Sequence, residues 1–326
     1  MIRKSLWVCV VCLVGLGLWA CSKDKGNGST PTITYDRLTL EFFSAAPLPS
    51  GMLYQLWASP KPGHLAASGS NWVSLARFNL RTSDTTMVDA NGVPIAGNLL
   101  TGLPVDFVDV DSLFVTVERA TGDAVGPSGT LYLRAKVPDI GAGLRIAAFT
   151  FPAPQIVAAQ DSISQFTFVS PTDNISNNEL SGVWFMTPSF TEGLFSLQPL
   201  PSGWDYEGWA TVQRGGHTYV LSTGRLDTPS GNDESAVHSG PQPPPGYPGE
   251  DFLNPSGTEP FPLVFASGDQ IKITVEPDQD PDSAAPFPFV VYTSPTGLVP
   301  DTLQPFRLRP HPESIPIAQG VVSKSE

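Results

Sequence analysis

Three aspartates at alternate positions, Asp278, Asp280 and Asp282, form the best candidate for a metal site in this sequence. Alternate carboxylates in a loop offer several oxygen ligands to a hard cation such as Ca²⁺. The segment has neither the following glycine nor the distal glutamate of an EF-hand loop, and Pro281 stiffens it. The pattern therefore leaves two interpretations open, a calcium site and a solvated hairpin loop.

Glu250 and Asp251 are the second candidate for a functional patch. They follow a Pro/Gly-rich stretch, residues 241–249, that predicts an extended loop. Loops on a rigid scaffold often carry binding residues. We therefore expect these two acids to be exposed and available to a ligand.

No catalytic constellation is visible in the sequence. The histidines, His64, His217, His238 and His311, are not at metal-ligand spacing from one another. Ser202 lies in Pro-Ser-Gly, which predicts a turn rather than the nucleophile elbow of a hydrolase. We expect no catalytic residues, and we expect that the protein is not an enzyme.

The first twenty residues resemble a bacterial export signal. Arg3 and Lys4 precede an apolar stretch, residues 6–18, that is too short to span a bilayer comfortably. The segment ends Leu-Trp-Ala-Cys21, which resembles a lipobox, so we expect cleavage after residue 20 and acylation of Cys21 with palmitate or a related chain. An ordinary secretory signal with an incidental cysteine is the alternative.

Residues 21–31 then form a flexible polar tether. Ser22, rather than aspartate, follows the acylated cysteine, which favours the outer membrane if the host is Gram-negative. We expect the protein in the bacterial cell envelope, anchored by lipid. Cys9 and Cys12 leave with the signal, so the mature chain can form no internal disulfide.

The charge of the mature chain excludes nucleic-acid binding. Loss of Arg3 and Lys4 from the 18 cationic residues leaves 16 against 31 acidic ones. Nucleic-acid binding needs a basic surface. The expected partners are the membrane, through the lipid anchor, and an envelope protein or glycan.

Short alternation of apolar and polar residues predicts β-strands. Leu113 to Glu118 and Ile271 to Glu276 alternate in this way, and the chain is rich in Pro (34) and Gly (30). Apolar residues with helical spacing are not sustained over any helical length. The sequence predicts an all-β protein built from antiparallel, immunoglobulin-like sandwiches.

An internal repeat indicates two tandem domains. Residues 43–58 and 195–210 are identical at ten of sixteen positions. Residues 107–118 and 265–276 match in a second block. We infer a duplication that gives one β-sandwich at 32–158 and another at 159–298, followed by a C-terminal tail at 299–326.

The repeated block contains a tyrosine and a tryptophan three positions apart, Tyr54 with Trp57 and Tyr206 with Trp209. Residues three apart in a regular strand face opposite sides of a sheet. Unless a bulge intervenes, we expect one ring in the core and the other near an edge or an interface. An exposed Trp57 or Trp209 could stack on a sugar.

Several segments resemble the extracytoplasmic domain of anti-sigma-K-type factors, a poorly characterised group of exported bacterial proteins. The resemblance covers most of residues 165–292 and, more weakly, residues 38–137. It is carried by residues 54–57, 170–174, 181–185, 206–209, 222–226, 248–253 and 284–287. It implies a β-sandwich and supplies neither a catalytic residue nor a ligand. Only the signal precedes Cys21, so we expect that this chain does not itself hold a cytoplasmic sigma factor.

The sequence thus predicts a lipid-anchored, non-catalytic binding or interaction module. Two alternatives are a carbohydrate-binding surface protein and an envelope regulatory protein related to anti-sigma sensor domains.

Overall fold

The chain folds into antiparallel β-sheets, which confirms the all-β prediction. The computed structural model describes residues 34–64, 71–122, 126–140, 145–153, 156, 164–194, 197–226, 230–257, 259–278 and 284–325. No helix in this described part is long and apolar enough to cross a membrane. The predicted signal, Cys21 and the tether lie outside the described residues.

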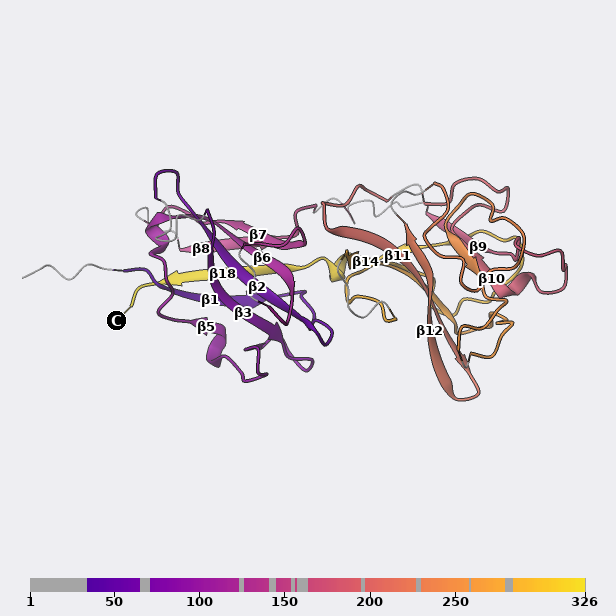
Figure 1. Ribbon diagram of the computed structural model, residues 1–326, viewed down its shortest axis with the longest axis horizontal. Coiled ribbons are helices and arrows are strands. Elements are labelled where there is room, and N and C mark those ends of the chain that lie inside the picture. The colour runs from indigo at the N-terminus through magenta and orange to yellow at the C-terminus, as the bar shows by residue number, and fades with distance from the viewer. Residues whose placement is uncertain are drawn as a thin grey trace, which may run out of the picture. The chain divides into compact units, whose positions relative to one another are not determined.

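The first half of the fold, residues 34–153, supplies eight strands of a nine-stranded sheet. The strands are β1 (Arg37–Phe42), β2 (Met52–Pro60), β3 (Val73–Leu80), β4 (Met87–Val88), β5 (Leu99–Leu100), β6 (Val110–Arg119), β7 (Leu131–Lys136) and β8 (Ile146–Thr150). Two short 3-10 helices, η1 (Ala96–Asn98) and η2 (Phe107–Asp109), precede β5 and β6. The order across the sheet is β4-β3-β2-β6-β7-β8-β18-β1-β5 (Figure 1).

The second half, residues 164–310, forms two smaller sheets. Its strands are β9 (Gln165–Phe168), β10 (Gly182–Trp184), β11 (Trp204–Arg214), β12 (His217–Leu226), β13 (Gly249–Asp251), β14 (Gln270–Pro277), β15 (Val290–Thr293), β16 (Phe306–Arg307) and β17 (Arg309–Pro310). One sheet has the order β13-β10-β9-β16 and the other β12-β11-β14-β15-β17. A 3-10 helix, η5 (Glu179–Ser181), precedes β10, and another, η6 (Pro312–Ser314), follows β17.

The predicted alternation places the expected side chains in the core. Leu113 and Val115 in β6, and Ile271 and Ile273 in β14, are at most 1% exposed. Each buried aliphatic side chain of this size stabilises the folded state by about 1.5–3 kcal/mol relative to exposure. The apolar positions of the two strands are therefore buried as the alternation predicts, but several polar positions, Thr116, Thr274 and Glu276, are buried too.

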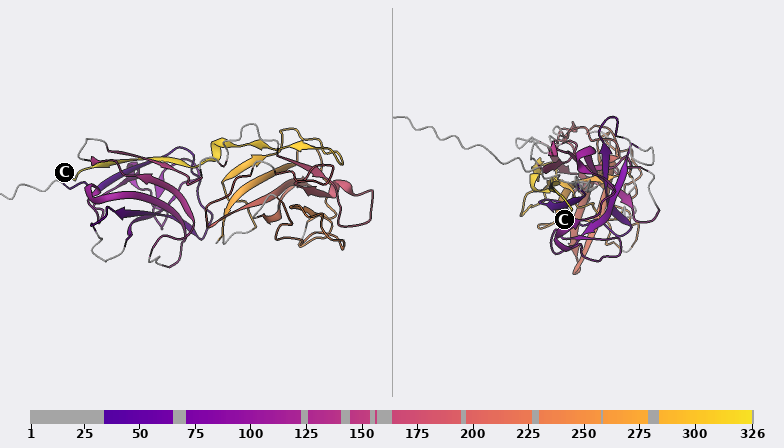
Figure 2. Two further views of the ribbon diagram at one scale, coloured as in Figure 1. Left: turned by 90° about the horizontal axis from the view of Figure 1, so that it is seen from above. Right: turned by 90° about the vertical axis from the view of Figure 1, so that its left-hand side faces the viewer.

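The C-terminal segment is part of the first-half sheet, so the expectation of a tail at residues 299–326 is wrong. Strand β18 (Ile317–Ser323) lies between β1 and β8 and pairs antiparallel with both. Figures 1 and 2 show this yellow segment passing from the second-half sheets to the indigo and purple strands of the first half. A Cβ on Gly320 would lie 2.9 Å from the Phe149 ring, so glycine lets β18 pack closely at this point.

Aromatic side chains join the two halves inside the described fold. The Trp204 ring lies 6.1 Å from Tyr132 and 5.8 Å from Phe151, centroid to centroid. Its indole Nε1 donates to the carbonyl oxygen of Leu131 at 3.0 Å. Aromatic contacts of this kind add stability beyond the area that they bury.

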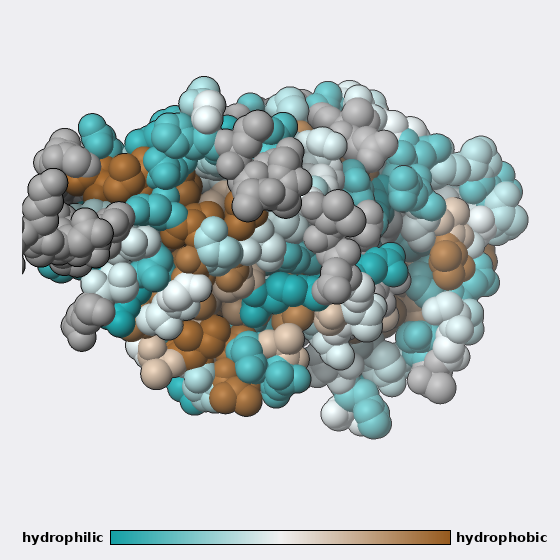
Figure 3. Space-filling view, turned by 60° about the vertical axis from the view of Figure 1, so that its left-hand side comes forward, coloured by the Kyte–Doolittle hydropathy of each residue, from teal (hydrophilic) through white to brown (hydrophobic). Residues whose placement is uncertain are grey.

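Parts of the surface remain apolar. Ile146, Ile317 and Val321 are 56%, 42% and 38% exposed. Val321 lies directly opposite Ile146 in the sheet. Figure 3 shows one face of the molecule, on which apolar residues in brown lie among polar residues in teal.

Candidate functional site

Glu250 and Asp251 lie in β13 and are fully buried, so the prediction of an exposed loop patch is wrong. The Pro/Gly-rich loop ends one residue earlier than expected, because Gly249 already pairs with Trp184 of β10. Neighbouring residues of a strand point to opposite faces. Both faces are covered here, so both carboxyl groups are removed from water.

Asp251 receives three hydrogen bonds. Oδ1 accepts from the Trp184 indole Nε1 at 2.6 Å. Oδ2 accepts from the Thr172 backbone nitrogen at 2.7 Å and from its hydroxyl at 2.5 Å. Burial raises the pKa of Asp251 to about 6, and these hydrogen bonds oppose that rise because they favour the ionised form.

Asp233 completes a cluster with Glu250. Asp233 accepts from the backbone nitrogens of Gly249 at 2.6 Å and Ser235 at 3.0 Å. Glu250 accepts from the hydroxyls of Ser235, at 3.3 Å, and Ser239. Burial raises the pKa of Asp233 to about 7 and also raises that of Glu250. We call Asp233, Glu250 and Asp251 the β13 carboxyl cluster.

The sequence analysis did not identify Asp233 as a member of this cluster. It lies in a polar stretch, Gly-Asn-Asp-Glu-Ser, that predicts only a turn. Its place depends on Gly249, which has φ of 151° and whose Cβ would lie 2.6 Å from the Trp184 Cα. A glycine within a strand can mark such a close approach of another backbone, but it does not specify which distant acid joins the pair.

The β13 carboxyl cluster holds loops to a sheet. Each of its six carboxyl oxygens accepts a hydrogen bond from a backbone or side-chain donor. Within the described ranges, no group of three or more His, Cys, Asp or Glu side chains is placed to hold a metal ion. The arrangement fixes the chain around residues 233–240 against β10 and β13.

Trp57 and Trp209 are also buried, at 2% and 1% exposure, so neither can stack on a sugar at the surface. The expectation that one ring of each repeated pair lies near an edge is wrong as well, because Tyr54 and Tyr206 are 1% and 4% exposed. Strand β2 pairs regularly with β6 through this stretch, and β11 does the same with β14. The extra residue of each local bulge lies on the partner strand, β3 or β12. The two rings therefore do point to opposite faces, and both faces are covered.

Each buried tryptophan begins a hydrogen-bond chain. In the first half, Trp57 Nε1 donates to the Thr116 hydroxyl at 2.9 Å, and that hydroxyl donates to Glu118 at 2.6 Å. Glu118 also accepts from the backbone nitrogen of Ser128 at 2.8 Å. The carboxylate therefore holds the β6–β7 connection against the strand that carries the threonine.

The second half repeats this chain of hydrogen bonds. Trp209 Nε1 donates to the Thr274 hydroxyl at 2.8 Å, and that hydroxyl donates to Glu276. Glu276 accepts from the backbone nitrogen of Phe287 at 2.9 Å and 3.1 Å. We call each set a Trp–Thr–Glu network. The tyrosines match too: Tyr54 donates to the carbonyl of Ala46 and Tyr206 to that of Gln198.

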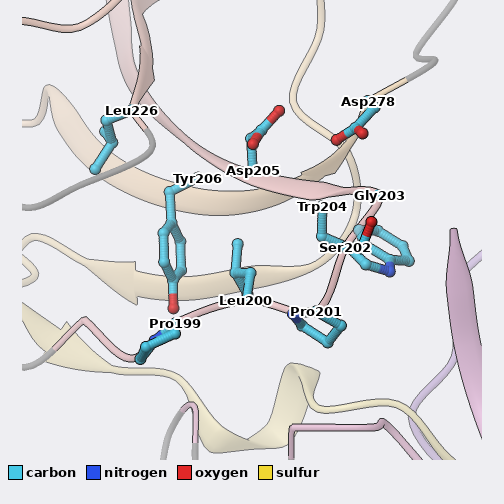
Figure 4. A pocket seen from close by; sticks show the side chains of 10 residues that line it. All are labelled: Pro199, Leu200, Pro201, Ser202, Gly203, Trp204, Asp205, Tyr206, Leu226 and Asp278. Atoms are coloured by element: carbon cyan, nitrogen blue, oxygen red, sulfur yellow. The ribbon is translucent and has the colours of Figure 1, made fainter. Parts of the chain in front are cut away.

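Asp278 is exposed and lines a cavity of about 340 Å³ in the second half. Figure 4 shows Asp278 and Asp205 on one side of this cavity, while the Tyr206 hydroxyl points toward Pro199 on the other. Arg225 lies 3.5 Å from Asp205 and offsets its charge. Asp280 and Asp282 lie outside the described residues, so the calcium site remains a prediction.

No known protein family matches the sequence, and no curated protein or solved structure matches the chain.

Proposed function

We propose that the chain is an exported bacterial lipoprotein, held in the cell envelope by acylated Cys21. Its folded part acts as a non-catalytic binding or interaction module made of two duplicated, immunoglobulin-like β-sandwich domains. The resemblance to the extracytoplasmic domain of anti-sigma-K-type factors suggests a role in the envelope but names no ligand.

One observation carries this proposal: in both halves, buried polar side chains that could have served a ligand site are bonded to one another instead. The Trp–Thr–Glu networks consist of Trp57 or Trp209 followed by a threonine and a glutamate two residues apart in one strand. The donors and acceptors follow the same order in both networks, and each network lies beside a tyrosine that donates to a carbonyl at a matching position. A duplication would leave this agreement. Groups used in this way stabilise the scaffold and are not available to a ligand.

The start of the described fold supports attachment through the first half. The carbonyl oxygen of Thr34 accepts from the backbone nitrogen of Ser325 at 3.1 Å. The Arg145 guanidinium lies 5.3 Å from the centre of the Tyr35 ring. The chain that follows the predicted tether is thus bonded at once to the first-half sheet. A lipid anchor at Cys21 would hold this half at the membrane and leave the second half free for a partner.

Metabolic labelling with a palmitate analogue tests the anchor. We expect label in the wild type and in Cys12→Ala, because Cys12 leaves with the signal, and no label in Cys21→Ala. Wild-type protein that carries no label and accumulates in the medium would show that the chain is freely secreted. Affinity purification from solubilised envelope then tests the interaction role, with the Cys21→Ala protein as the matched control for anchoring.

A further inference from the structure

A cavity of about 570 Å³ opens over β14, β15 and β17 in the second half. Its lining is mostly polar and includes Lys272 from β14, Thr293 from β15, Arg309 from β17 and His311 just after β17. The loop that follows β15 adds residues 294–297. This cavity is distinct from the β13 carboxyl cluster and from the cavity in Figure 4.

Sheet pairing places three of these side chains in one row. Lys272 lies opposite Thr293, and Thr293 lies opposite Arg309. Directly opposite residues project from the same face of a sheet, and adjacent strands are about 4.8 Å apart. An amine, a hydroxyl and a guanidinium therefore lie on one side of three neighbouring strands, and all three line the cavity.

The cavity lining carries two cations, Lys272 and Arg309, and two acids, Asp269 and Glu313. Both acids already have partners: Asp269 accepts from Arg214 at 2.6 Å and 2.9 Å, and Glu313 Oε1 lies 3.2 Å from His311 Nε2. Within the described part of the chain, Lys272 and Arg309 form no ion pair.

Lys272 is partly buried, and this burial lowers its pKa. A cation without a counter-ion in a partly desolvated place is costly. An anion in the cavity would offset that cost.

The first half lacks this arrangement. At the position that matches Lys272 in the repeat, it has Phe114, whose ring meets that of Trp72 edge-on at 5.0 Å. Phe114 lies opposite Trp57 just as Lys272 lies opposite Trp209. The shared scaffold therefore does not require a lysine here, and the second half carries a feature of its own.

We propose that this cavity binds the phosphate group of a small ligand, with Lys272, Thr293 and Arg309 as its donors. The guanidinium offers two parallel N–H groups to two phosphate oxygens, the ammonium acts as a point charge, and the threonine hydroxyl donates to a third oxygen. Donors from three strands suit a tetrahedral oxyanion better than a planar carboxylate. The phosphate is either free or carried as a monoester on a small organic molecule. The inference rests on the proposed function only in taking the protein as a binding module.

Calorimetric titration of the full chain in non-ionic detergent at low ionic strength tests the site. Inorganic phosphate should bind with one site per chain, and acetate should bind much more weakly. Arg309→Gln and Lys272→Met should each weaken phosphate binding by at least about tenfold, because each removes a charge-assisted hydrogen bond. Arg309 is exposed, so its variant keeps the test valid if Lys272→Met folds poorly.

Arg134→Gln is the matched control, since Arg134 is an exposed cation that lies opposite Phe114 in the first half. Three results would each overturn the site. The first is a loss of phosphate affinity in Arg134→Gln as large as that in Arg309→Gln. The others are acetate binding as tight as phosphate binding, and folded wild type that binds no phosphate. Binding of methyl phosphate as tight as that of phosphate would identify a monoester, and binding of inorganic phosphate alone would identify the free ion. Palmitate labelling of Cys21 is independent of these variants, so loss of the site and loss of the anchor are distinguishable.

Discussion

The Trp–Thr–Glu network of the second half gives the sharpest prediction for stability. Thr274→Val keeps the shape of the side chain and removes its hydroxyl, which bonds both Trp209 Nε1 and Glu276. A buried donor left without a partner costs about 1–3 kcal/mol, and a hydrogen bond to a charged group contributes about 1.5–3 kcal/mol. Glu276 keeps the Phe287 backbone nitrogen as a partner. We therefore expect the free energy of unfolding to fall by about 3 kcal/mol.

The first half provides the matched comparison. Thr116 and Thr274 are both 0% exposed, but Glu118 is half-buried whereas Glu276 is 0% exposed. Water can replace the lost hydroxyl at Glu118, so we expect Thr116→Val to cost about half as much. Thr274→Ser keeps the hydroxyl and should cost only about 1 kcal/mol for the lost methyl group.

Urea unfolding measures these free energies, and hydrogen exchange of the Trp209 indole N–H gives a local measure that does not depend on two-state behaviour. The indole proton should exchange faster in Thr274→Val and remain protected in Thr274→Ser. If Thr274→Val cost less than about 1 kcal/mol, or if serine cost as much as valine, the network would not stabilise the fold in the way that we infer.

Two further predictions concern the β13 carboxyl cluster. The pKa values of Asp233 and Asp251 are raised to about 7 and about 6 in the folded state, so that state retains protons which the unfolded chain releases. The stabilisation is complete below the unfolded pKa, about 4, and is lost as the pH rises to about 7. The urea midpoint should therefore fall across that interval and fall less in Asp233→Asn, and an equal fall in both proteins would contradict this. Gly249→Ala should unfold at a clearly lower urea concentration than Gly246→Ala, because the Cβ at residue 249 would meet the Trp184 backbone at 2.6 Å, whereas a Cβ at residue 246, where φ is also positive, would meet open space. Equal midpoints would count against a tight approach.

Local features of the sequence were enough to predict that the protein is all-β with antiparallel sheets. Alternation of period two along Leu113 to Val117 and Ile271 to Val275 reports burial of one strand face, and this property depends on neighbouring residues. The repeat likewise picked out the strands that carry the two tryptophans. The spacing of three residues also predicted correctly that Tyr54 and Trp57 face opposite sides of the sheet, since this follows from strand geometry.

Tertiary structure decided what covers each face and which strands pair. Trp57 and Trp209 are buried even though they lie on the face opposite the tyrosines, and no local pattern reports that this second face is covered. Glu250 and Asp251 were assigned to a loop because the composition before them is typical of loops, but β10 pairs with them from about seventy residues away.

The C-terminal segment shows the same limit most clearly. Strand β18 pairs with β1, which brings together residues as far apart in the sequence as Arg37 and Ser323. Alternation of apolar and polar residues predicts a strand but does not predict which distant strand it pairs with. The sequence by itself thus determined the type of secondary structure and the duplicated pattern, because both are local. Long-range pairing and burial, which are properties of the whole fold, determined which of the candidate side chains remain accessible to a ligand.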